Sequence, residues 1–444
     1  MNKTGDLNRS TVSTEDLYHL YLKHPFVCTD TRSVHSGDLF FALKGENFNG
    51  NHFALQALAN GAAYAIIDEQ IEDAGQHKDR LVFVENVLTA LQLLAAHHRN
   101  QFSIPFIAIT GSNGKTTTKE LIHAVLSLKY KTSTTEGNLN NHIGIPLTLL
   151  KIKPDAEIAI VEMGANHIGE IAGYCLYTRP THGLITNVGK AHLEGFGSPE
   201  GVKKGKGELY DYLRAHGGTA FVMWDYDYLQ QMSKGISEII SYGTAQADLT
   251  GTVESAFPQL QILMTGGVHL DKIQTQLTGN YNLPNLLAAV CVGNYFNVNP
   301  SDIRTGIEAY TPSNSRSQLM QIGTNTIILD AYNANPSSMK SAIENFSAYP
   351  SKNKILLLGA MAELGRDSLQ EHTIILNQIL TEKWKEVVLV GGDFLKLKHP
   401  FKHFKNAEEA GKWLASQNFQ HSVLLVKGSR SMRMEQAIES LKLI

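Results

Sequence analysis

The chain has 444 residues, 43% of them hydrophobic and 18% charged, which is typical of a globular protein with about two to four domains. A net charge of −3 gives no electrostatic case for nucleic acid, and no apolar run approaches membrane-spanning length. Three distant cysteines, Cys28, Cys175 and Cys291, match neither a zinc-binding spacing nor a disulfide framework. Because residues 1–9 are also polar and lack the apolar core of a signal peptide, we expect a cytoplasmic protein.

Residues 1–86 predict a small α/β unit. The capping residue Ser13 and the apolar spacing that follows predict the first helix, and short apolar runs predict strands. The expected elements are a helix at 14–22, a strand at 38–43, a helix at 52–60 and a strand at 63–67. Asp30 and Arg32 stand beside these strands and are open to two interpretations. They form a local ion pair that holds a turn, or the arginine binds a substrate phosphate.

A helix at 87–100 leads into a pattern typical of a phosphate-binding loop. A β-branched strand at 106–109 ends in Gly111-Ser-Asn-Gly-Lys-Thr-Thr, and a helix at 115–128 begins there. Glycines let backbone N–H groups approach an anion, and the positive end of the helix dipole adds to the attraction. The usual first glycine of such a motif is replaced by Ile109. We interpret this stretch as an ATP site formed by Gly111, Ser112, Asn113, Gly114, Lys115, Thr116 and Thr117.

Beyond this loop, strands and helices alternate, which predicts a doubly wound parallel sheet. The expected strands are 106–109, 157–161, 183–188 and 219–223, and the expected helices are 115–128, 170–176 and 199–213. Ligands of such sheets bind beyond the carboxyl ends of the strands. Glu162 and His192 follow two of these strands, so we expect them to bind metal or nucleotide beside the loop.

Residues 136–146 form an amide-rich segment that we expect to be a loop. Its asparagines, Asn138 and Asn140 among them, suit either a self-bonded turn or a polar ligand, and the sequence favours neither interpretation. Short strands are expected at 249–253, 260–263 and 267–273, followed by an alanine-rich helix at 286–295.

A boundary is expected near Pro312-Ser-Asn-Ser, and a second alternating unit follows it. Its expected strands are 326–330, 354–358, 386–390 and 422–426, and its expected helices are 337–346, 369–380 and 407–415. The unit lacks a glycine-rich dinucleotide fingerprint after its first strand. Three polar clusters, at 330–336, 359–365 and 427–430, follow its strands and are expected to project from one edge of the sheet.

Taken together, the motifs resemble those of the Mur ligases of peptidoglycan synthesis, from Asp30 to Glu435. They are Thr110-Gly-Ser-Asn-Gly-Lys-Thr-Thr, Asn138-Leu-Asn-Asn, Glu162-Met-Gly-Ala, Asn187-Val-Gly-Lys-Ala-His-Leu-Glu-Gly-Phe-Gly-Ser and Asp330-Ala-Tyr-Asn-Ala-Asn-Pro. The last of these, with Met361-Ala-Glu-Leu-Gly and Lys427-Gly-Ser-Arg, resembles the members that add D-alanyl-D-alanine to UDP-N-acetylmuramoyl-tripeptide.

The resemblance implies three α/β domains and a reaction. The implied domains are a UDP-sugar-binding domain at 1–86, a central P-loop-type ATP-binding domain at 87–312 and a Rossmann-like domain for dipeptide and nucleotide at 313–444. The implied chemistry is ATP-dependent amide ligation through an acyl phosphate, with Mg²⁺ as cofactor and ADP as product. A monomer is expected.

The resemblance also assigns roles to particular residues. Lys115, His192 and Lys206 are implied to be catalytic, and Thr116, Glu162, His192 and Lys206 to hold metal, the last as a carbamylated lysine. From composition alone, Lys203, Lys204 and Lys206 are better explained as a solvated basic face. The implied nucleotide contacts are Asn282, Arg316 and Asp330. The implied substrate contacts are Asp30, Arg32, Asn138, Asn140, Tyr332, Asn333 and Asn335.

The sequence departs from the family pattern at four places. Tyr281 stands where a histidine is usual, Ala360 replaces an aspartate, Asn49-Gly-Asn replaces Asp-Gly-His, and Gly205 replaces an alanine. These differences affect individual contacts and leave the implied reaction unchanged.

Overall fold

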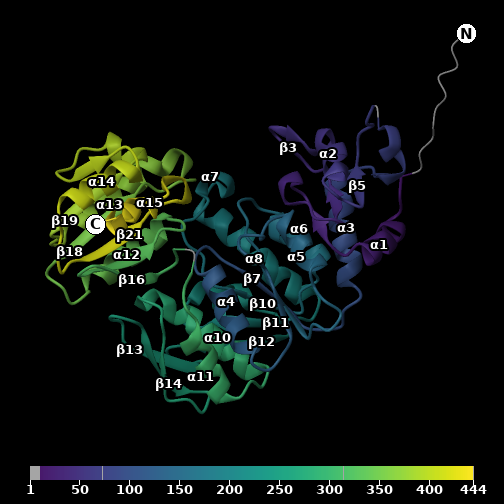
Figure 1. The fold of residues 1–444 in the computed structure, drawn as a ribbon. Coiled ribbons are helices and arrows are strands. Elements are labelled where there is room, and N and C mark those ends of the chain that lie inside the picture. The colour runs from purple at the N-terminus through teal and green to yellow at the C-terminus, as the bar shows by residue number, and fades with distance from the viewer. Residues whose placement is uncertain (1–10, 73, 314, 444) are drawn as a thin grey trace, which may run out of the picture. The chain divides into compact units, whose positions relative to one another are not determined.

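The computed structural model describes residues 11–72, 74–313 and 315–443 (Figure 1). The polar segment 1–9 and Asn314, at the expected domain boundary, lie outside the described residues. The chain divides into two compact units. One comprises residues up to 107, 131–163 and 172–180, and the other 108–130, 164–171 and everything from 181 onward. Among the described residues, no helix is both long and apolar enough to cross a bilayer.

The first unit begins with a four-stranded parallel sheet of order β1-β2-β5-β6. Its core is formed by Phe40, Ala65 and Ile67 of the strands against Ala54, Ala57 and Leu58 of α2. The strands of this sheet are β1 (Val27–Cys28), β2 (Leu39–Phe41), β5 (Tyr64–Ile67) and β6 (Leu81–Phe83). The same part of the chain contains α1 (Thr14–Lys23), α2 (Ala54–Ala59) and a separate antiparallel pair, β3 (Lys44–Gly45) and β4 (Phe48–Asn49). The remaining elements are α3 (Val87–Arg99), β8 (Thr132–Thr134), α5 (Gly144–Leu150), β9 (Ile158–Glu162) and α6 (Glu170–Thr178), the last of which begins in the second unit.

One expectation for the first unit is wrong. Residues 136–146 are not a loop throughout, because α5 starts at Gly144. A Cβ at this glycine would lie 2.4 Å from the backbone of Leu139, so the close approach of the preceding turn requires glycine. The turn itself is made by Asn141, whose Oδ1 accepts hydrogen bonds from the N–H groups of Ile143 and Gly144. The sequence signal of this helix is masked by the polar residues of its own N-terminal turn.

The second unit opens with the end of β7 (Phe106–Thr110), the phosphate loop and α4 (Lys115–Leu126). Strands β10 to β13 are parallel, whereas β14 and β15 extend the sheet in antiparallel fashion. The strand expected at 267–273 is largely wrong, because only β15 (Lys272–Gln274) pairs and Gly267 turns with φ 82°. Its further elements are β10 (His182–Ile185), α7 (Leu193–Phe196), α8 (Pro199–Ala215), β11 (Thr219–Met223), α9 (Asp227–Ser233), β12 (Glu238–Gly243), β13 (Leu249–Ser255), β14 (Gln261–Gly266), α10 (Leu283–Tyr295) and α11 (Pro300–Ala309).

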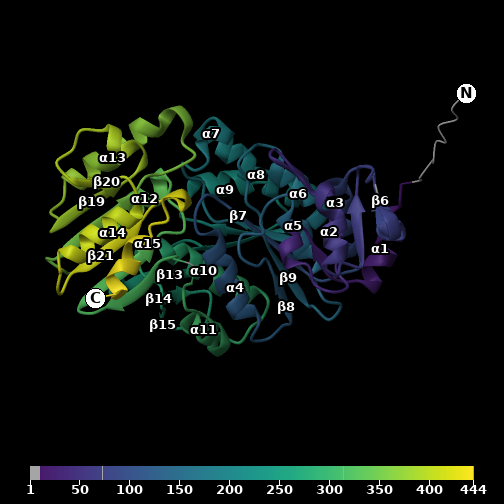
Figure 2. The ribbon, with the colours of Figure 1, turned by 45° about the horizontal axis from the view of Figure 1, so that its top comes forward.

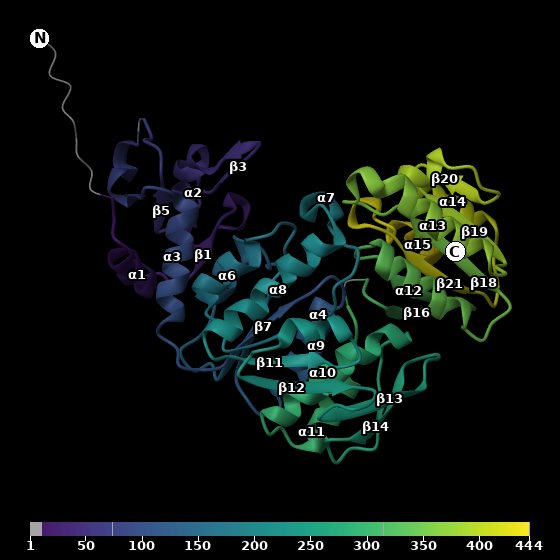
Figure 3. The same ribbon diagram turned by 180° about the vertical axis from the view of Figure 1, so that it is seen from behind.

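The C-terminal part of the second unit is a six-stranded sheet of order β16-β17-β21-β18-β19-β20, parallel except for β16 (Figures 2 and 3). Helices α14 and α15 pack their alanines and leucines on the strands. Because β17, β21 and β18 are parallel, Asp330, Lys427 and Gly359 end at one edge, as expected. The elements are β16 (Gln318–Ile322), β17 (Asn325–Asp330), α12 (Pro336–Ser347), β18 (Lys354–Gly359), α13 (Ser368–Leu380), β19 (Glu386–Val390), β20 (Lys402–Phe404), α14 (Ala407–Ser416), β21 (Val423–Lys427) and α15 (Gln436–Glu439).

A buried arginine holds the first unit together and provides a test of this fold. The guanidinium of Arg99 lies over the ring of Phe106 and donates to the carbonyls of Thr178, Phe102 and Arg179 at 2.7, 2.9 and 2.9 Å. Arg99→Met fills the space but removes the donors to these carbonyls, so we expect the free energy of unfolding to fall by about 3 kcal/mol. Calorimetry should show the first transition lowered by about 6 °C or more. Arg366→Met, at an exposed side chain, is the control, and an equal effect there would contradict this account.

Candidate active site

The phosphate loop is a tight turn that two glycines make possible. Gly111 has φ 141° and Gly114 has φ 80°, a backbone conformation that side chains oppose. A Cβ at Gly114 would lie 2.5 Å from Oδ1 of Asn285, and one at Gly111 would collide with the hydroxyl of Thr186. Neither glycine position therefore has room for a side chain, and the chain can turn tightly in front of the N-terminus of α4, where an anion can bind.

The segment after β10 clamps this loop. The Asn113 N–H donates to Oδ1 of Asn187 at 3.0 Å, while the Asn113 carbonyl accepts from the Thr186 hydroxyl at 2.6 Å and from Nδ2 of Asn187 at 3.0 Å. Ser112 adds a reciprocal pair with Gly189, since its hydroxyl donates to the Gly189 carbonyl and accepts from the Gly189 N–H, each at 3.0 Å. These contacts hold the loop in one shape.

Lys115 folds back into the loop that precedes it. Its ammonium donates to the carbonyls of Gly111 at 2.8 Å and Ser112 at 3.3 Å. Thr116 and Thr117 follow it, buried in the first turn of α4. A fixed positive charge therefore lies at the loop, next to the N-terminus of a helix whose dipole has the same sign.

Lys206, on α8, is fully buried and is not part of a solvated basic face. Its ammonium donates to the carbonyl of Ala165 at 2.9 Å and lies 5.0 Å from the ring centre of Phe196. Burial, and secondarily the charge of Lys115, hold the pKa of Lys206 well below the usual value for lysine. This shift favours the neutral form of the amine, which is the nucleophilic form.

The loop that carries His192 meets acidic residues that follow β18. Nδ1 of His192 lies 2.5 Å from a carboxylate oxygen of Glu363, and Nζ of Lys190 lies 2.6 Å from Oε1 of Glu371. Contact with His192 lowers the pKa of Glu363. His192 itself has φ 52°, so the chain turns sharply there and directs the imidazole toward this carboxylate. The predicted metal-site histidine is thus paired with a carboxylate from the C-terminal sheet.

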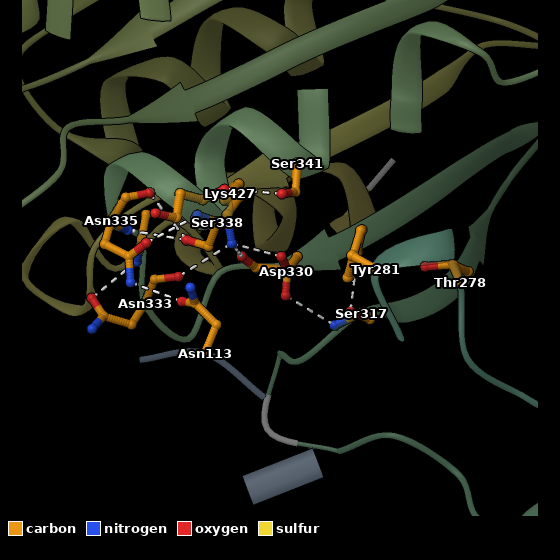
Figure 4. A network of polar contacts seen from close by, with 12 residues as sticks. Asn113, Thr278, Tyr281, Ser317, Asp330, Asn333, Asn335, Ser338, Ser341 and Lys427 are labelled. Carbon is orange, nitrogen blue, oxygen red and sulfur yellow. Dashed lines mark hydrogen bonds and ion pairs between the residues drawn. The ribbon is translucent and has the colours of Figure 1, made fainter. Parts of the chain in front are cut away.

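Asp330 is held by two donors at the edge of the C-terminal sheet (Figure 4). One carboxylate oxygen accepts from the Ser317 N–H at 3.1 Å, and the other from the Lys427 ammonium at 2.6 Å. The hydroxyls of Ser317 and Tyr281 lie 3.2 Å apart, and burial raises the pKa of Tyr281. The buried Asn282 donates to the Thr278 carbonyl at 2.7 Å, so this end of the site is a continuous polar network.

Residues 330–336, the acceptor motif of the predicted ligase, include Tyr332, whose ring has two arginines beside it. The guanidinium of Arg316 lies 3.5 Å from the ring centre of Tyr332, and that of Arg430 lies 5.8 Å from it. Oδ1 of Asn333 accepts from the N–H of Ala334 at 2.9 Å and from that of Arg430 at 3.4 Å. Arg430 is also paired with Glu435 at 3.2 Å, so Arg316 contributes most of the positive charge beside this ring.

The other predicted residues lie in the first unit. Nδ2 of Asn140 donates to Oε1 of Glu162 at 2.7 Å, whereas Oε2 of Glu162 is buried and has no hydrogen-bond partner among the described residues. Asn138 contributes its carbonyl to the turn, accepting from the Asn140 N–H at 2.7 Å. Asp30 and Arg32 form the local ion pair at 2.6 Å, and this contact lowers the pKa of Asp30 to about 2. Both side chains are largely exposed, so the pair leaves the arginine accessible.

Family models match three consecutive segments of the chain. They are described as "Mur ligase family, catalytic domain" at residues 24–99, "Mur ligase middle domain" at 109–293 and "Mur ligase, glutamate ligase domain" at 315–430. This chain belongs to the Mur ligase family.

Individual Mur ligases resemble the chain over nearly its whole length. The UDP-N-acetylmuramoyl-tripeptide–D-alanyl-D-alanine ligase of Escherichia coli strain K12 is 35% identical, with 94% of this chain and 93% of the relative covered. The crystal structure of MurF from Acinetobacter baumannii superposes with a TM-score of 0.85 at 31% identity, covering 94% of this chain and 93% of the other. MurF ligase from Thermotoga maritima, in complex with ADP, gives a TM-score of 0.85 at 26% identity, covering 95% and 98%.

Sequence reasoning missed several residues that shape this site. Thr186 and Asn187 clamp the phosphate loop, Ser317 and Lys427 hold Asp330, and Glu363 faces His192. Asn187, Glu363 and Lys427 belong to motifs that the sequence singled out as polar strand ends, yet nothing in the sequence pairs them with their partners. Thr186 and Ser317 give no signal of their own.

The clamp predicts that the phosphate loop tolerates no methyl group at Gly114. Gly114→Ala adds strain at φ 80° and a 2.5 Å collision with Asn285, so the loop must move. Because displacement by about 1 Å costs on the order of 10²-fold in rate, we expect ATP-dependent turnover to fall by about that factor. Gly217→Ala is the matched control, since Gly217 also has a positive φ, 68°, but open space around it. Equal effects at both glycines would show that strain alone is responsible.

Proposed function

We propose that this chain joins D-alanyl-D-alanine to UDP-N-acetylmuramoyl-tripeptide, using ATP and releasing ADP and phosphate. The observation that carries the proposal is the pairing of a clamped phosphate loop with the polar edge at Asp330 to Asn335 in one compact unit. A nucleotide switch needs only the first of these features, whereas a ligase needs both. The likeness of the whole chain to ligases of this specificity supports the same reading.

The chemistry requires an activated carboxylate. The terminal carboxylate of the tripeptide attacks the γ-phosphorus of ATP, the bond to ADP breaks, and an acyl phosphate forms. The amine of D-alanyl-D-alanine then adds to the acyl carbon, loses a proton, and the tetrahedral intermediate expels inorganic phosphate. Phosphoryl transfer of this kind depends on positioning and charge neutralisation, which Lys115 and the N-terminus of α4 are placed to provide.

Mg²⁺ would be held by Thr116, Glu162, His192 and a carbamylated Lys206, and when bound it would neutralise phosphate charge. The donor set fits a hard cation, because Glu162 keeps a buried carboxylate oxygen without a hydrogen-bond partner among the described residues. Within that described part of the chain, no three His, Cys, Asp or Glu side chains form a ready metal site.

We further propose the domain roles. Residues 1–86 bind the UDP-sugar through groups such as Arg32, residues 87–312 bind ATP, and residues 313–444 bind the dipeptide and part of the nucleotide. In this scheme Asn282, Arg316 and Asp330 contact the nucleotide. Tyr332, Asn333 and Asn335 lie on the dipeptide side, and Asn138 and Asn140 on the side of the tripeptide. The enzyme acts in the cytoplasm as a monomer.

The amine that the enzyme requires as acceptor distinguishes this function from that of a nucleotide switch or a different Mur ligase. We expect steady ADP release to need both UDP-N-acetylmuramoyl-tripeptide and D-alanyl-D-alanine. An acyl phosphate that is shielded from water is not hydrolysed, so turnover stops until the amine reacts with it. The measurement is coupled ADP release against a panel of acceptors. Lys115→Ala serves as the site control and should lose about 10²- to 10³-fold in kcat, as when other charge-stabilising groups are removed. ADP release without any acceptor would indicate a switch, and equal use of glutamate or diaminopimelate would indicate a different Mur ligase.

The burial of Lys206 predicts a carbamate. A neutral amine adds CO₂ and loses a proton, which gives an oxygen ligand with negative charge where an ammonium would repel a cation. Lys206→Ala should therefore be inactive, and added acetate or formate should restore part of the activity. Enzyme equilibrated with ¹³C-bicarbonate should show a carbamate resonance that this variant lacks. Lys204→Ala, at an exposed position of the same helix, is the control. Near-normal turnover in Lys206→Ala would exclude the carbamate.

A further inference from the structure

Asn335 is fully engaged in protein contacts at the start of α12. Its Oδ1 accepts from the Ser338 N–H at 2.9 Å, and its own backbone N–H donates to the Ser338 hydroxyl at 3.1 Å, which is a capping box. Its Nδ2 donates to Oδ1 of Asn113 at 2.8 Å (Figure 4). Asn335 is also almost fully buried. Both halves of the carboxamide are therefore committed to protein groups.

The partner, Asn113, belongs to the phosphate loop. Its backbone N–H and carbonyl are held by Thr186 and Asn187, so the main chain cannot follow a displaced side chain. Oδ1 of Asn113 is thereby fixed as an acceptor that faces the C-terminal segment. The hydrogen bond to Asn335 spans 222 positions of sequence and joins the ATP loop to the acceptor motif.

Neighbouring contacts hold the same two segments together. The Lys190 N–H donates to the Ser337 hydroxyl at 2.9 Å, and the Lys190 ammonium pairs with Glu371 at 2.6 Å. A Cβ at Gly189 would lie 2.7 Å from that same hydroxyl, so the backbone there is in close contact with α12. Among these contacts, the Asn113–Asn335 bond alone involves a residue of the Gly111–Thr116 loop itself.

We propose that Asn335 is a positioning residue that couples the phosphate loop to the acceptor motif, so that bound ATP aligns the D-alanyl-D-alanine site. This inference rests on the proposed function and goes beyond the direct substrate contact that the sequence implies for Asn335. Asn333, two residues earlier, is held in the same segment by the Lys427 ammonium, which donates to its carbonyl at 3.3 Å. A change in the position of the Asn113 side chain is therefore passed to the acceptor motif through one hydrogen bond.

Coupling of this kind has a thermodynamic signature, because each ligand changes the affinity of the other by the same factor. A neutral hydrogen bond is worth about three- to tenfold in such an equilibrium. In the wild-type enzyme with UDP-N-acetylmuramoyl-tripeptide bound, we expect a non-hydrolysable ATP analogue to tighten D-alanyl-D-alanine binding about fivefold. Isothermal titration with and without the analogue measures this factor.

Two variants remove the bond from opposite sides while keeping the helix cap. Asn113→Ala leaves Asn335 and its cap untouched, and Asn335→Ser retains a good capping residue that is too short to reach Asn113. In each variant, and in the double variant, the coupling factor should fall to about one. The loss in kcat/KM for D-alanyl-D-alanine should be about fivefold in each single variant and no greater in the double, because one interaction is removed only once.

Asn406→Ser is the matched control. Asn406 caps α14 in the same way, accepting from the Glu409 N–H at 2.9 Å, but caps a helix that has no contact with the phosphate loop among the described interactions. It should keep the full coupling factor. The proposal is overturned if wild type shows no coupling, if both single variants retain it, or if the losses in the double variant multiply. Failure of the proposed function would differ, since wild-type enzyme would then neither bind D-alanyl-D-alanine nor release ADP with it.

Discussion

The hydrogen bonds between Asn113 and the segment after β10 are the constraint on which the rest of the site depends. A phosphate-binding turn works only if its backbone N–H groups point inward, and glycines permit that shape without enforcing it. Here Thr186 and Asn187, directly after β10, hold the turn in that shape through their hydrogen bonds to Asn113. Because the same segment continues to Lys190 and His192, the clamp that shapes the ATP loop also fixes the residues that face α12 and α13.

Several charged side chains of this fold are buried. Lys206 is buried with a depressed pKa, and Lys427 is buried but paired with Asp330. Glu162 keeps one shielded oxygen beside the amide of Asn140. Such arrangements are costly in the absence of ligands, because each buried charge loses hydration. A ligand that binds the folded chain offsets part of that cost, so stability and ligand affinity are linked in this fold.

Strong local patterns made most of the fold predictable from the sequence. The strand–turn–helix at Gly111 to Thr116 and the parallel edge that carries Asp330 and Lys427 were both anticipated, since apolar runs and glycine turns specify them locally. Helix α5 was missed because its start is hidden in an asparagine turn. The partners in the site were not predictable. Asn113 with Asn335 and His192 with Glu363 are brought together only by tertiary packing, about which single-sequence periodicity carries no information.

Asn113 is followed directly by Gly114, and this pair has a consequence for chemical ageing. In a flexible chain an asparagine before glycine readily deamidates, because the unhindered glycine nitrogen attacks the side-chain carbonyl carbon to form a succinimide. That cyclisation needs rotation of both the side chain and the backbone of Asn113, which four hydrogen bonds oppose here. The product aspartate would place a carboxylate at the cradle for a triphosphate. The contacts that give the loop its shape therefore also oppose deamidation of Asn113.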